Sequence, residues 1–345
     1  MLCAHDLPLA SARRTPEAAA LCLGAVSIDY RELARLITGF ARSLVSDGLR
    51  FQDRVAIYAE KSIEAVAAMF GTMAAGSVMV PINPLLKDEQ VAYILRDSDV
   101  AVLVTTPARL SALGAVLGQC PALRQVVVIG EIPGGEAAGP LRYRRFGEAE
   151  PIREGDRIDD LGGVVEAGGG SGRLPRLPRT IDGDLAAILY TSGSTGGPKG
   201  VVLSHRNLVE GAQSVASYLD NRPSDRILAL LPFSFDYGFS QLTTAFLVGA
   251  CVVLHNYLLA GEVVRVLARE RITGLAAVPP LWLQLIAQPW PPGAAATLRY
   301  FTNSGGAMPT PVLATLRDRM PAAKPFLMYG LTEAFRSTFL PPEEI

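Results

Sequence analysis

Cysteine and histidine are scarce in this chain. Among 345 residues there are four cysteines and three histidines. The cysteines lie far apart at Cys3, Cys22, Cys120 and Cys251 and form no Cys-x-x-Cys pair, which argues against a zinc site or a disulfide framework. No histidine cluster, Ser-His-Asp set or metal triad is visible in the sequence. Unpaired cysteines fit a reducing compartment, so we expect a cytoplasmic protein.

An excess of charge of either sign is also lacking. The chain has 32 basic and 33 acidic residues and a net charge of -1, so no broad basic field is available to attract nucleic acid. Two long uncharged stretches, 65–82 and 237–254, approach the length of a membrane span. Both contain many small residues, and each has a glycine (Gly76, Gly249) where a helix-like pattern of apolar residues changes to a strand-like one. We therefore expect each to be a buried helix that turns into a buried strand, and no membrane span.

Apolar runs of strand length alternate with helix-like stretches in both halves of the chain. Continuous apolar runs are typical of strands buried on both faces, so the predicted fold class is α/β with mainly parallel sheets. Residues 131–181 break this rhythm. They are rich in Gly, Pro, Arg and acidic residues, and we predict a flexible surface insertion there.

A loop rich in glycine and hydroxyl groups, with one lysine, follows the apolar run 185–189. Glycines allow several backbone N–H groups to face one anion, and hydroxyls and a lysine add hydrogen bonds and charge. The loop is not a Walker A motif, because Pro198 precedes Lys199 and Gly200 follows it. We predict a triphosphate site, with a flexible linker as the alternative. The binding residues would be Thr191, Ser192, Gly193, Ser194, Thr195, Gly196 and Lys199.

The run from Tyr190 to Gly200 resembles the phosphate-binding signature of the adenylate-forming superfamily. This superfamily contains acyl-CoA synthetases, luciferases and the adenylation domains of nonribosomal peptide synthetases. Two further segments, 305–307 and 329–333, resemble the Gly-Gly-Ala and Tyr-Gly-x-Thr-Glu motifs of the same proteins, in the same order. The stretches 234–238 and 332–338 are similar to acyl-CoA ligases associated with bacterial exosortase systems.

The resemblance implies two α/β subdomains and a missing third part. One subdomain would cover 58–205, and the other would combine 1–57 with 206–345. The family's small C-terminal lid domain, with the lysine that contacts the reacting carboxylate, is not found in the sequence. We therefore expect this chain alone to be inactive or weakly active.

The resemblance also implies the roles of the nucleotide-binding residues. Lys199, Thr332 and Glu333 would be catalytic, with Thr332 at the α-phosphate of ATP and Glu333 as the ligand of Mg²⁺. Tyr329 would stack on adenine. The remaining contacts would come from Gly305, Gly306, Ala307 and Gly330. The alternatives are a solvated lysine, a core tyrosine that ends a strand, a helix start at Thr332 and a simple β-turn at 305–307.

The acid substrate would contact Phe235, Asp236, Tyr237, Gly238 and Ser304. Acyl-CoA synthetases commonly have histidine at the position of Phe235, whereas the Phe-Asp pair resembles peptide-synthetase adenylation domains, in which the aspartate binds the substrate amino group. A buried aspartate needs a partner, so we predict an amino-bearing or otherwise cationic acid. The alternative is that Asp236 caps a helix that begins near Phe239. His205 either starts a helix or lines an acyl tunnel.

The implied function is an AMP-forming ligase that uses ATP and Mg²⁺ to convert a small carboxylic or amino acid into an acyl adenylate. The acyl group would then pass to coenzyme A or to the phosphopantetheine of a carrier protein, which makes an acyl carrier protein a candidate partner. The alternatives are an amino-acid adenylation domain of the peptide-synthetase type and a binding module without catalysis.

Overall fold

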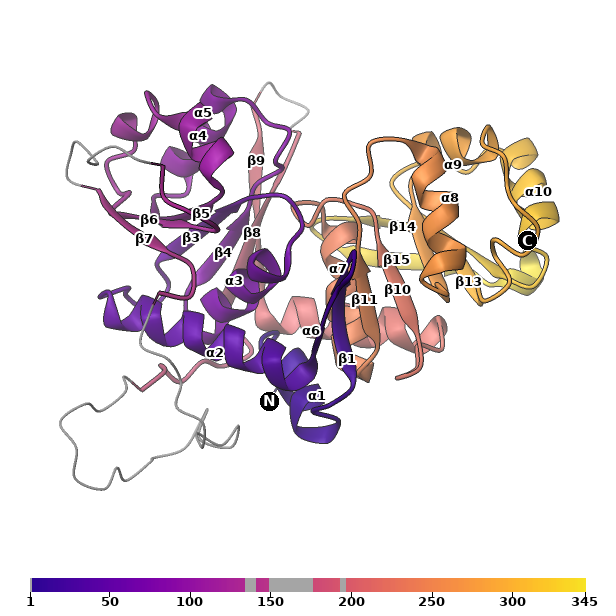
Figure 1. The fold of residues 1–345 in the computed structure, drawn as a ribbon, viewed down its shortest axis with the longest axis horizontal. Coiled ribbons are helices and arrows are strands. Elements are labelled where there is room, and N and C mark those ends of the chain that lie inside the picture. Colours follow the sequence, from indigo (N-terminus) through magenta and orange to yellow (C-terminus); the bar gives the residue numbers. More distant parts are fainter. Residues whose placement is uncertain (1, 134–140, 149–175, 193–196) are drawn as a thin grey trace. The chain divides into compact units, whose positions relative to one another are not determined.

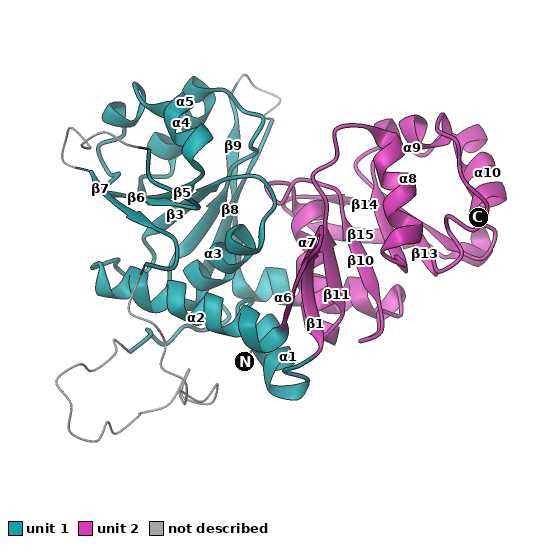
Figure 2. Cartoon of the chain, in the orientation of Figure 1, with its two compact units in different colours: residues 1–17, 30–209 teal, residues 18–29, 210–345 magenta. Residues whose placement is uncertain are grey.

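The computed structural model describes residues 2–133, 141–148, 176–192 and 197–345. The chain forms two compact units (Figures 1 and 2). Unit 1 contains residues 1–17 and 30–209, and unit 2 contains residues 18–29 and 210–345. The predicted insertion at 131–181 falls mostly outside the described residues.

Unit 1 is built on a seven-stranded sheet in the order β7-β6-β5-β3-β4-β8-β9. All neighbouring pairs are parallel except β8 and β9. The strands are β3 (Arg54–Tyr58), β4 (Val78–Pro81), β5 (Val100–Thr105), β6 (Gln125–Val128), β7 (Arg142–Arg145), β8 (Leu185–Thr191) and β9 (Lys199–Ser204). The helices are α1 (Asp6–Arg14), α2 (Tyr30–Ser46), α3 (Ile63–Ala74), α4 (Asp88–Asp97) and α5 (Pro107–Leu113), and α6 (His205–Tyr218) begins here and continues into unit 2.

The helices of unit 1 cover both faces of this sheet. Apolar side chains of α4 and α5 pack with those of β3, β4, β5 and β6 in one core, and α2 packs along α3. Helix α3 is buried almost throughout, and its N-terminus is capped by Ser62, whose side chain accepts a hydrogen bond from Ala65 N. Strands β3, β4 and β5 are therefore enclosed between helices, as their continuous apolar sequences predict.

Unit 2 is built on an eight-stranded sheet in the order β15-β14-β13-β12-β10-β11-β1-β2. The two edge pairs, β14–β15 and β1–β2, are antiparallel, and the pairs between them are parallel. The strands are β1 (Ala19–Leu23), β2 (Val26–Asp29), β10 (Arg226–Ala229), β11 (Cys251–Leu254), β12 (Gly274–Ala277), β13 (Tyr300–Asn303), β14 (Lys324–Leu331) and β15 (Phe335–Leu340).

Helices also enclose the central strands of unit 2. One core joins β10–β13 to α8 (Ala260–Arg269), α9 (Pro279–Ile286) and α10 (Thr310–Arg319), with Trp282 and Phe301 fully buried in it. A second core joins α6 and α7 (Asp236–Val248) to β12, β13 and β14. The predicted α/β fold class with mainly parallel sheets is confirmed.

The unit boundaries differ from the expected ones of 1–57 with 206–345. The chain does return to its second unit, but only residues 18–29 of the N-terminal part belong there, as β1 and β2. Residues 1–17 and 30–57 belong to unit 1. The reason is α2, whose buried residues lie on one side of the helix and pack along α3.

The two apolar stretches that approach the length of a membrane span form helix–strand pairs, as expected. Residues 65–82 contain most of α3 followed by β4, and 237–254 contain most of α7 followed by β11. In the part of the chain that the structure describes, no helix is long and apolar enough to cross a membrane. All four cysteines are free thiols in this structure.

Candidate functional site

The predicted phosphate loop connects β8 to β9, which pair as an antiparallel hairpin with Thr191 opposite Lys199. Residues Gly193, Ser194, Thr195 and Gly196 lie outside the described residues. Of the described ones, Ser192 and Lys199 are exposed and Thr191 is partly exposed. The base of the loop thus presents a hydroxyl side chain and a cationic side chain from opposite strands.

Two tyrosines fix the hairpin against α4. Tyr93 donates a hydrogen bond to Pro198 O at 3.2 Å, and Tyr190 donates one to Asp97 Oδ2 at 2.5 Å. Burial, together with that carboxylate, raises the pKa of Tyr190, so the phenol stays protonated and remains a donor. Gly200 leaves space for Ile188 and the ring of Tyr190, because a Cβ there would lie 2.7 Å from Ile188 Cγ2 and 3.2 Å from Tyr190 Cζ. The loop therefore leaves the sheet from a rigid base.

Residues 329–333 run from the end of β14 into the turn of the β14–β15 hairpin. Tyr329 and Gly330 lie on either side of a register shift near the end of β14, and Thr332 and Glu333 lie in the turn itself. The alternative of a helix start at Thr332 is wrong, because β15 begins at Phe335 and pairs back onto β14. Tyr329 is 63% exposed, so it is not the core aromatic of the other alternative. Thr332 is buried and Glu333 is exposed.

The Gly305–Ala307 segment follows β13 directly. Gly305 has a φ of +75°, and a Cβ there would lie 3.3 Å from Val278 Cγ1. Asn303 Nδ2 donates a hydrogen bond to Gly306 O at 2.9 Å and holds the turn. Ser304 is buried, whereas residues 305–307 are exposed. The segment therefore offers bare, ordered backbone to a ligand, and the β-turn alternative describes the same geometry.

The predicted substrate segment starts α7, and Asp236 is the first residue of that helix. Asp236 therefore does not cap a helix beginning at Phe239, which corrects that alternative. Its partner is Arg336 in β15, whose Nη1 donates to Asp236 Oδ2 at 2.9 Å. The sequence reasoning missed this arginine, although the residue lies in the stretch 332–338.

The residues next to Asp236 are tightly packed. Gly238 admits no side chain, since a Cβ there would lie 2.0 Å from Pro232 O. The buried Tyr237 hydroxyl is hydrogen-bonded to Thr302 Oγ1 in β13. Phe235 Cζ lies 3.6 Å from the position that a Cβ of Gly305 would take. The start of α7 is thereby fixed against the end of β13.

In unit 2 the sequence motifs follow the ends of three parallel strands. Residues 235–238 follow β10, 304–307 follow β13, and 329–333 end β14. Carboxyl ends of parallel strands meet at one edge of a sheet, which is where open α/β sheets bind ligands. The structure thus brings the predicted substrate and adenine-binding segments to one edge of unit 2, while the phosphate loop belongs to unit 1.

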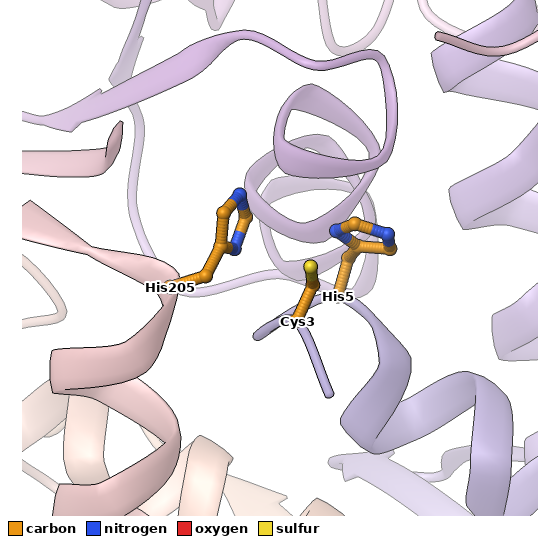
Figure 3. A group of neighbouring side chains, drawn as sticks. All are labelled: Cys3, His5 and His205. Atoms are coloured by element: carbon orange, nitrogen blue, oxygen red, sulfur yellow. The ribbon is translucent and has the colours of Figure 1, made fainter. Parts of the chain in front are cut away.

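His205 is the first residue of α6, as the helix-start interpretation expects. It lies next to Cys3 and His5, and the three side chains point toward one another with potential ligand atoms within 4.8 Å (Figure 3). The sequence did not reveal this group. His205 Nδ1 accepts a hydrogen bond from Ala4 N at 3.1 Å, which ties the N-terminal segment to the start of α6. His5 Nδ1 and His205 Nε2 are buried without a hydrogen-bond partner among the described residues.

Comparison with known proteins agrees with these motifs. The family model described as "AMP-binding enzyme" matches residues 9–344. The chain is 31% identical over 336 residues to the L-proline--[L-prolyl-carrier protein] ligase of Streptomyces coelicolor, covering 94% of this chain and 58% of that protein. It is 29% identical over 330 residues to a feruloyl-CoA synthase of an Amycolatopsis species, covering 95% of this chain and 59% of the relative.

The chain is also similar to solved structures of adenylate-forming enzymes. The complex of VinN with 3-methylaspartate superposes with a TM-score of 0.75 at 26% identity, covering 99% of this chain and 82% of VinN. The anthranilate CoA ligase AuaEII with anthranoyl-AMP gives a TM-score of 0.82 at 23% identity, covering 100% of this chain and 62% of that protein, and shows the shared fold. The chain spans a little under three fifths of the two curated relatives named above. With a family model that matches nearly its whole length, this chain belongs to the AMP-binding enzyme family and thus to the adenylate-forming superfamily that its motifs resemble.

Proposed function

We propose that this chain is the ATP- and acid-binding part of an AMP-forming ligase. The carboxylate of the acid attacks the α-phosphorus of ATP, an acyl adenylate forms, and pyrophosphate leaves. The acyl group then passes to a thiol, either of coenzyme A or of a carrier-protein phosphopantetheine. The observation that supports this most is the edge of unit 2 at which the bare Gly305–Gly306 backbone follows β13 and the Tyr329–Glu333 segment ends the adjacent parallel strand β14 and forms the turn after it.

Because acid and nucleotide are both anionic, catalysis depends on positioning and on neutralising charge on the departing pyrophosphate. In the proposal the 191–199 loop, with the cation of Lys199, holds the β- and γ-phosphates. The exposed ring of Tyr329 stacks on adenine, and the hydroxyl of Thr332 donates to the α-phosphate. Lys199 begins β9, Tyr329 lies near the end of β14 and Thr332 lies in the turn that follows, so paired strands hold these three residues in place before the nucleotide binds.

Glu333 fits the role of a magnesium ligand. Magnesium takes oxygen ligands and is usually held by one or two carboxylates together with substrate phosphates, and the carboxylate of Glu333 is exposed in the hairpin turn beside Thr332. When bound, the ion would neutralise charge on the phosphates. The role of this chain is to offer one carboxylate there and to keep Thr332 next to it.

The acid is proposed to carry an ammonium or another cationic group that contacts Asp236, as the Phe-Asp pair at 235–236 predicts. Two relatives support an amino-bearing substrate. One is named as a ligase of L-proline, and VinN is described in complex with 3-methylaspartate and with L-aspartate. Feruloyl-CoA synthase is named for an acid without an amino group, so CoA ligation of a plain acid remains the second candidate. A cytoplasmic location and the exosortase-associated subgroup stay predictions.

ATP–pyrophosphate exchange tests the proposed function, and calorimetry with ATP and magnesium tests nucleotide binding separately. We expect weak acid-dependent exchange and an ATP affinity that falls in Lys199→Ala. An intact fold that binds no ATP would instead favour the alternative of a binding module without this chemistry. Thiol transfer is measured with coenzyme A and with phosphopantetheinylated carrier protein side by side, and the acceptor that yields a thioester distinguishes the two types of ligase.

A further inference from the structure

The buried ion pair between Asp236 and Arg336 has a geometry that bears on the substrate. Arg336 Nη1 donates to Asp236 Oδ2 at 2.9 Å, and Nη2 donates to the Asp236 carbonyl at 3.3 Å. Only 2% of the Arg336 side chain and 6% of the Asp236 side chain are exposed. Replacing a buried ion pair with apolar side chains is often neutral or stabilising. A contribution to stability therefore does not by itself explain why a buried ion pair is present here.

Arg336 also has a donor that is not used. A guanidinium group has five N–H donors in a rigid fork, and two of its nitrogens reach Asp236. The third, Nε, is buried and has no hydrogen-bond partner among the described residues. The ring centroids of Phe335 and Tyr237 lie 4.1 Å and 5.2 Å from Arg336 Cζ and help to hold the group in place. Nε is thus an oriented donor that lacks an acceptor.

The charge balance of the pair restricts which acid can bind here. Arg336 already neutralises the carboxylate of Asp236. A substrate ammonium alone would place two cations on one buried carboxylate, which is unfavourable in a site removed from water. An ammonium accompanied by a second anionic group adds no net charge. It also gives both members of the pair a new partner.

The pair lies next to the proposed reaction site within unit 2. Thr332, proposed to contact the α-phosphate, lies in the turn that leads into β15, and Arg336 is the second residue of that strand. Asp236 follows Phe235, which approaches the backbone of Gly305. An acid held by both Asp236 and Arg336 therefore has its remaining carboxylate on the edge of the sheet where the nucleotide is proposed to bind.

We infer that the activated acid is an amino dicarboxylic acid, an inference that rests on the proposed function. Its ammonium binds Asp236, one carboxylate accepts a hydrogen bond from Arg336 Nε, and the other carboxylate is adenylated. Arg336 is then a specificity-determining residue, and the Asp236–Arg336 pair recognises an ammonium and a carboxylate together.

Two matched sets of acids test this inference. L-Aspartate, β-alanine and succinate all carry the carboxylate to be activated, but β-alanine lacks the second carboxylate and succinate lacks the ammonium. Glutamate, γ-aminobutyrate and glutarate repeat the comparison with one more methylene. Affinity is measured by calorimetry on this chain with ATP and magnesium present, so that no turnover is needed. We expect one amino dicarboxylic acid to bind about tenfold or more tightly than both of its matched acids, the size expected for a lost charged hydrogen bond.

Arg336→Lys is the informative variant. Lysine keeps the charge beside Asp236 but lacks the planar fork and its Nε donor. We expect the preference for aspartate over β-alanine, or for glutamate over γ-aminobutyrate, to fall about tenfold, with ATP affinity unchanged. Asp236→Asn should remove the preference over succinate or glutarate instead. If a variant fails to fold, the two sets measured on the wild-type chain still decide the inference.

The outcomes separate this inference from the proposed function. If the chain binds ATP but prefers a matched monoamine, a plain diacid or a fatty acid to the amino dicarboxylic acids, the inference is wrong and the ligase proposal stands. Binding of ATP with none of the six acids also rejects the inference. If ATP itself does not bind, the proposed function and the inference fail together.

Discussion

Gly330 lies directly against the backbone of Phe335: a Cβ on Gly330 would stand 1.8 Å from the Phe335 carbonyl oxygen. This contact closes the hairpin that presents Tyr329, Thr332 and Glu333. Phe335 itself has a φ of +53°, a conformation that is uncommon for a bulky residue. The signature glycine is therefore required by the close approach of the two strands, independently of any ligand.

The change Gly330→Ala should destabilise the fold by about 1–3 kcal/mol, the usual cost of forcing extra atoms into a packed site. The strands must separate to admit the methyl group, so ATP affinity should fall as well. Urea unfolding and ATP calorimetry measure the two effects. Gly118→Ala is the control, because nothing lies within 4 Å of a Cβ there. Equal stability of the two variants would contradict this account of the hairpin.

Lys199→Ala should reduce acid-dependent pyrophosphate exchange by about a hundredfold, the usual loss for one well-placed charged donor at a developing charge. Stability should not change, because the side chain is exposed at the start of β9. Exchange kinetics and urea unfolding of the same preparation check both statements. The control is Lys324→Ala, which removes an exposed lysine at the opposite, amino end of β14. A similar loss of exchange in the control would indicate a general electrostatic effect.

Some features were predictable from the sequence because they are local. The α/β class follows from continuous apolar runs such as 100–105 and 251–254, which form strands buried in every residue. The loop after β8 and the turn after β13 were predictable because both segments are rich in glycine, which favours loops and turns over helices and strands. The described motif residues lie at or near the ends of strands, as the apolar runs before them in the sequence predict.

The features that were missed depend on contacts between distant residues. Arg336 lies 100 positions from Asp236, and no local pattern indicates that a return strand brings the two together. His205 and Ala4 are 201 positions apart. Residues 1–57 were expected in unit 2, but α2 packs along α3 in unit 1. The apolar side of a helix shows that the helix packs against something, but it does not show against which element.

The stability of the chain should fall as the pH falls below 6.5, the pKa of a histidine in the unfolded chain. Burial, with a smaller effect of His5, lowers the pKa of His205 from 6.5 to about 3. Below pH 6.5 the unfolded chain therefore binds a proton that the folded chain does not, and the folded state loses about 1.4 kcal/mol per pH unit for this group. The contribution is fully present above pH 6.5 and is lost progressively toward pH 3.

Urea unfolding between pH 7.5 and pH 4.5 measures this slope. His205→Asn keeps an acceptor for Ala4 N but cannot be protonated, so its slope should be smaller by about one proton. Burial lowers the pKa of His5 as well, and a residual slope in the variant is expected for that reason. An unchanged slope would mean that folding does not lower the pKa of His205.

Glu333→Gln should weaken binding of the ATP–magnesium complex more than binding of ATP without the metal. The amide keeps the size of the side chain and one oxygen ligand but removes the negative charge that a divalent cation requires. Glu333 is exposed in the hairpin turn, so the fold should tolerate the change, and the cost should appear as a higher magnesium concentration at half-maximal exchange. Glu343→Gln is the matched control, since that carboxylate is exposed in the short helix Pro342–Glu344 that follows β15. If both variants respond to magnesium as the unaltered chain does, the carboxylate of Glu333 is not a metal ligand, and the assignment of the Tyr329–Glu333 turn to the phosphates of ATP would rest on Thr332 alone.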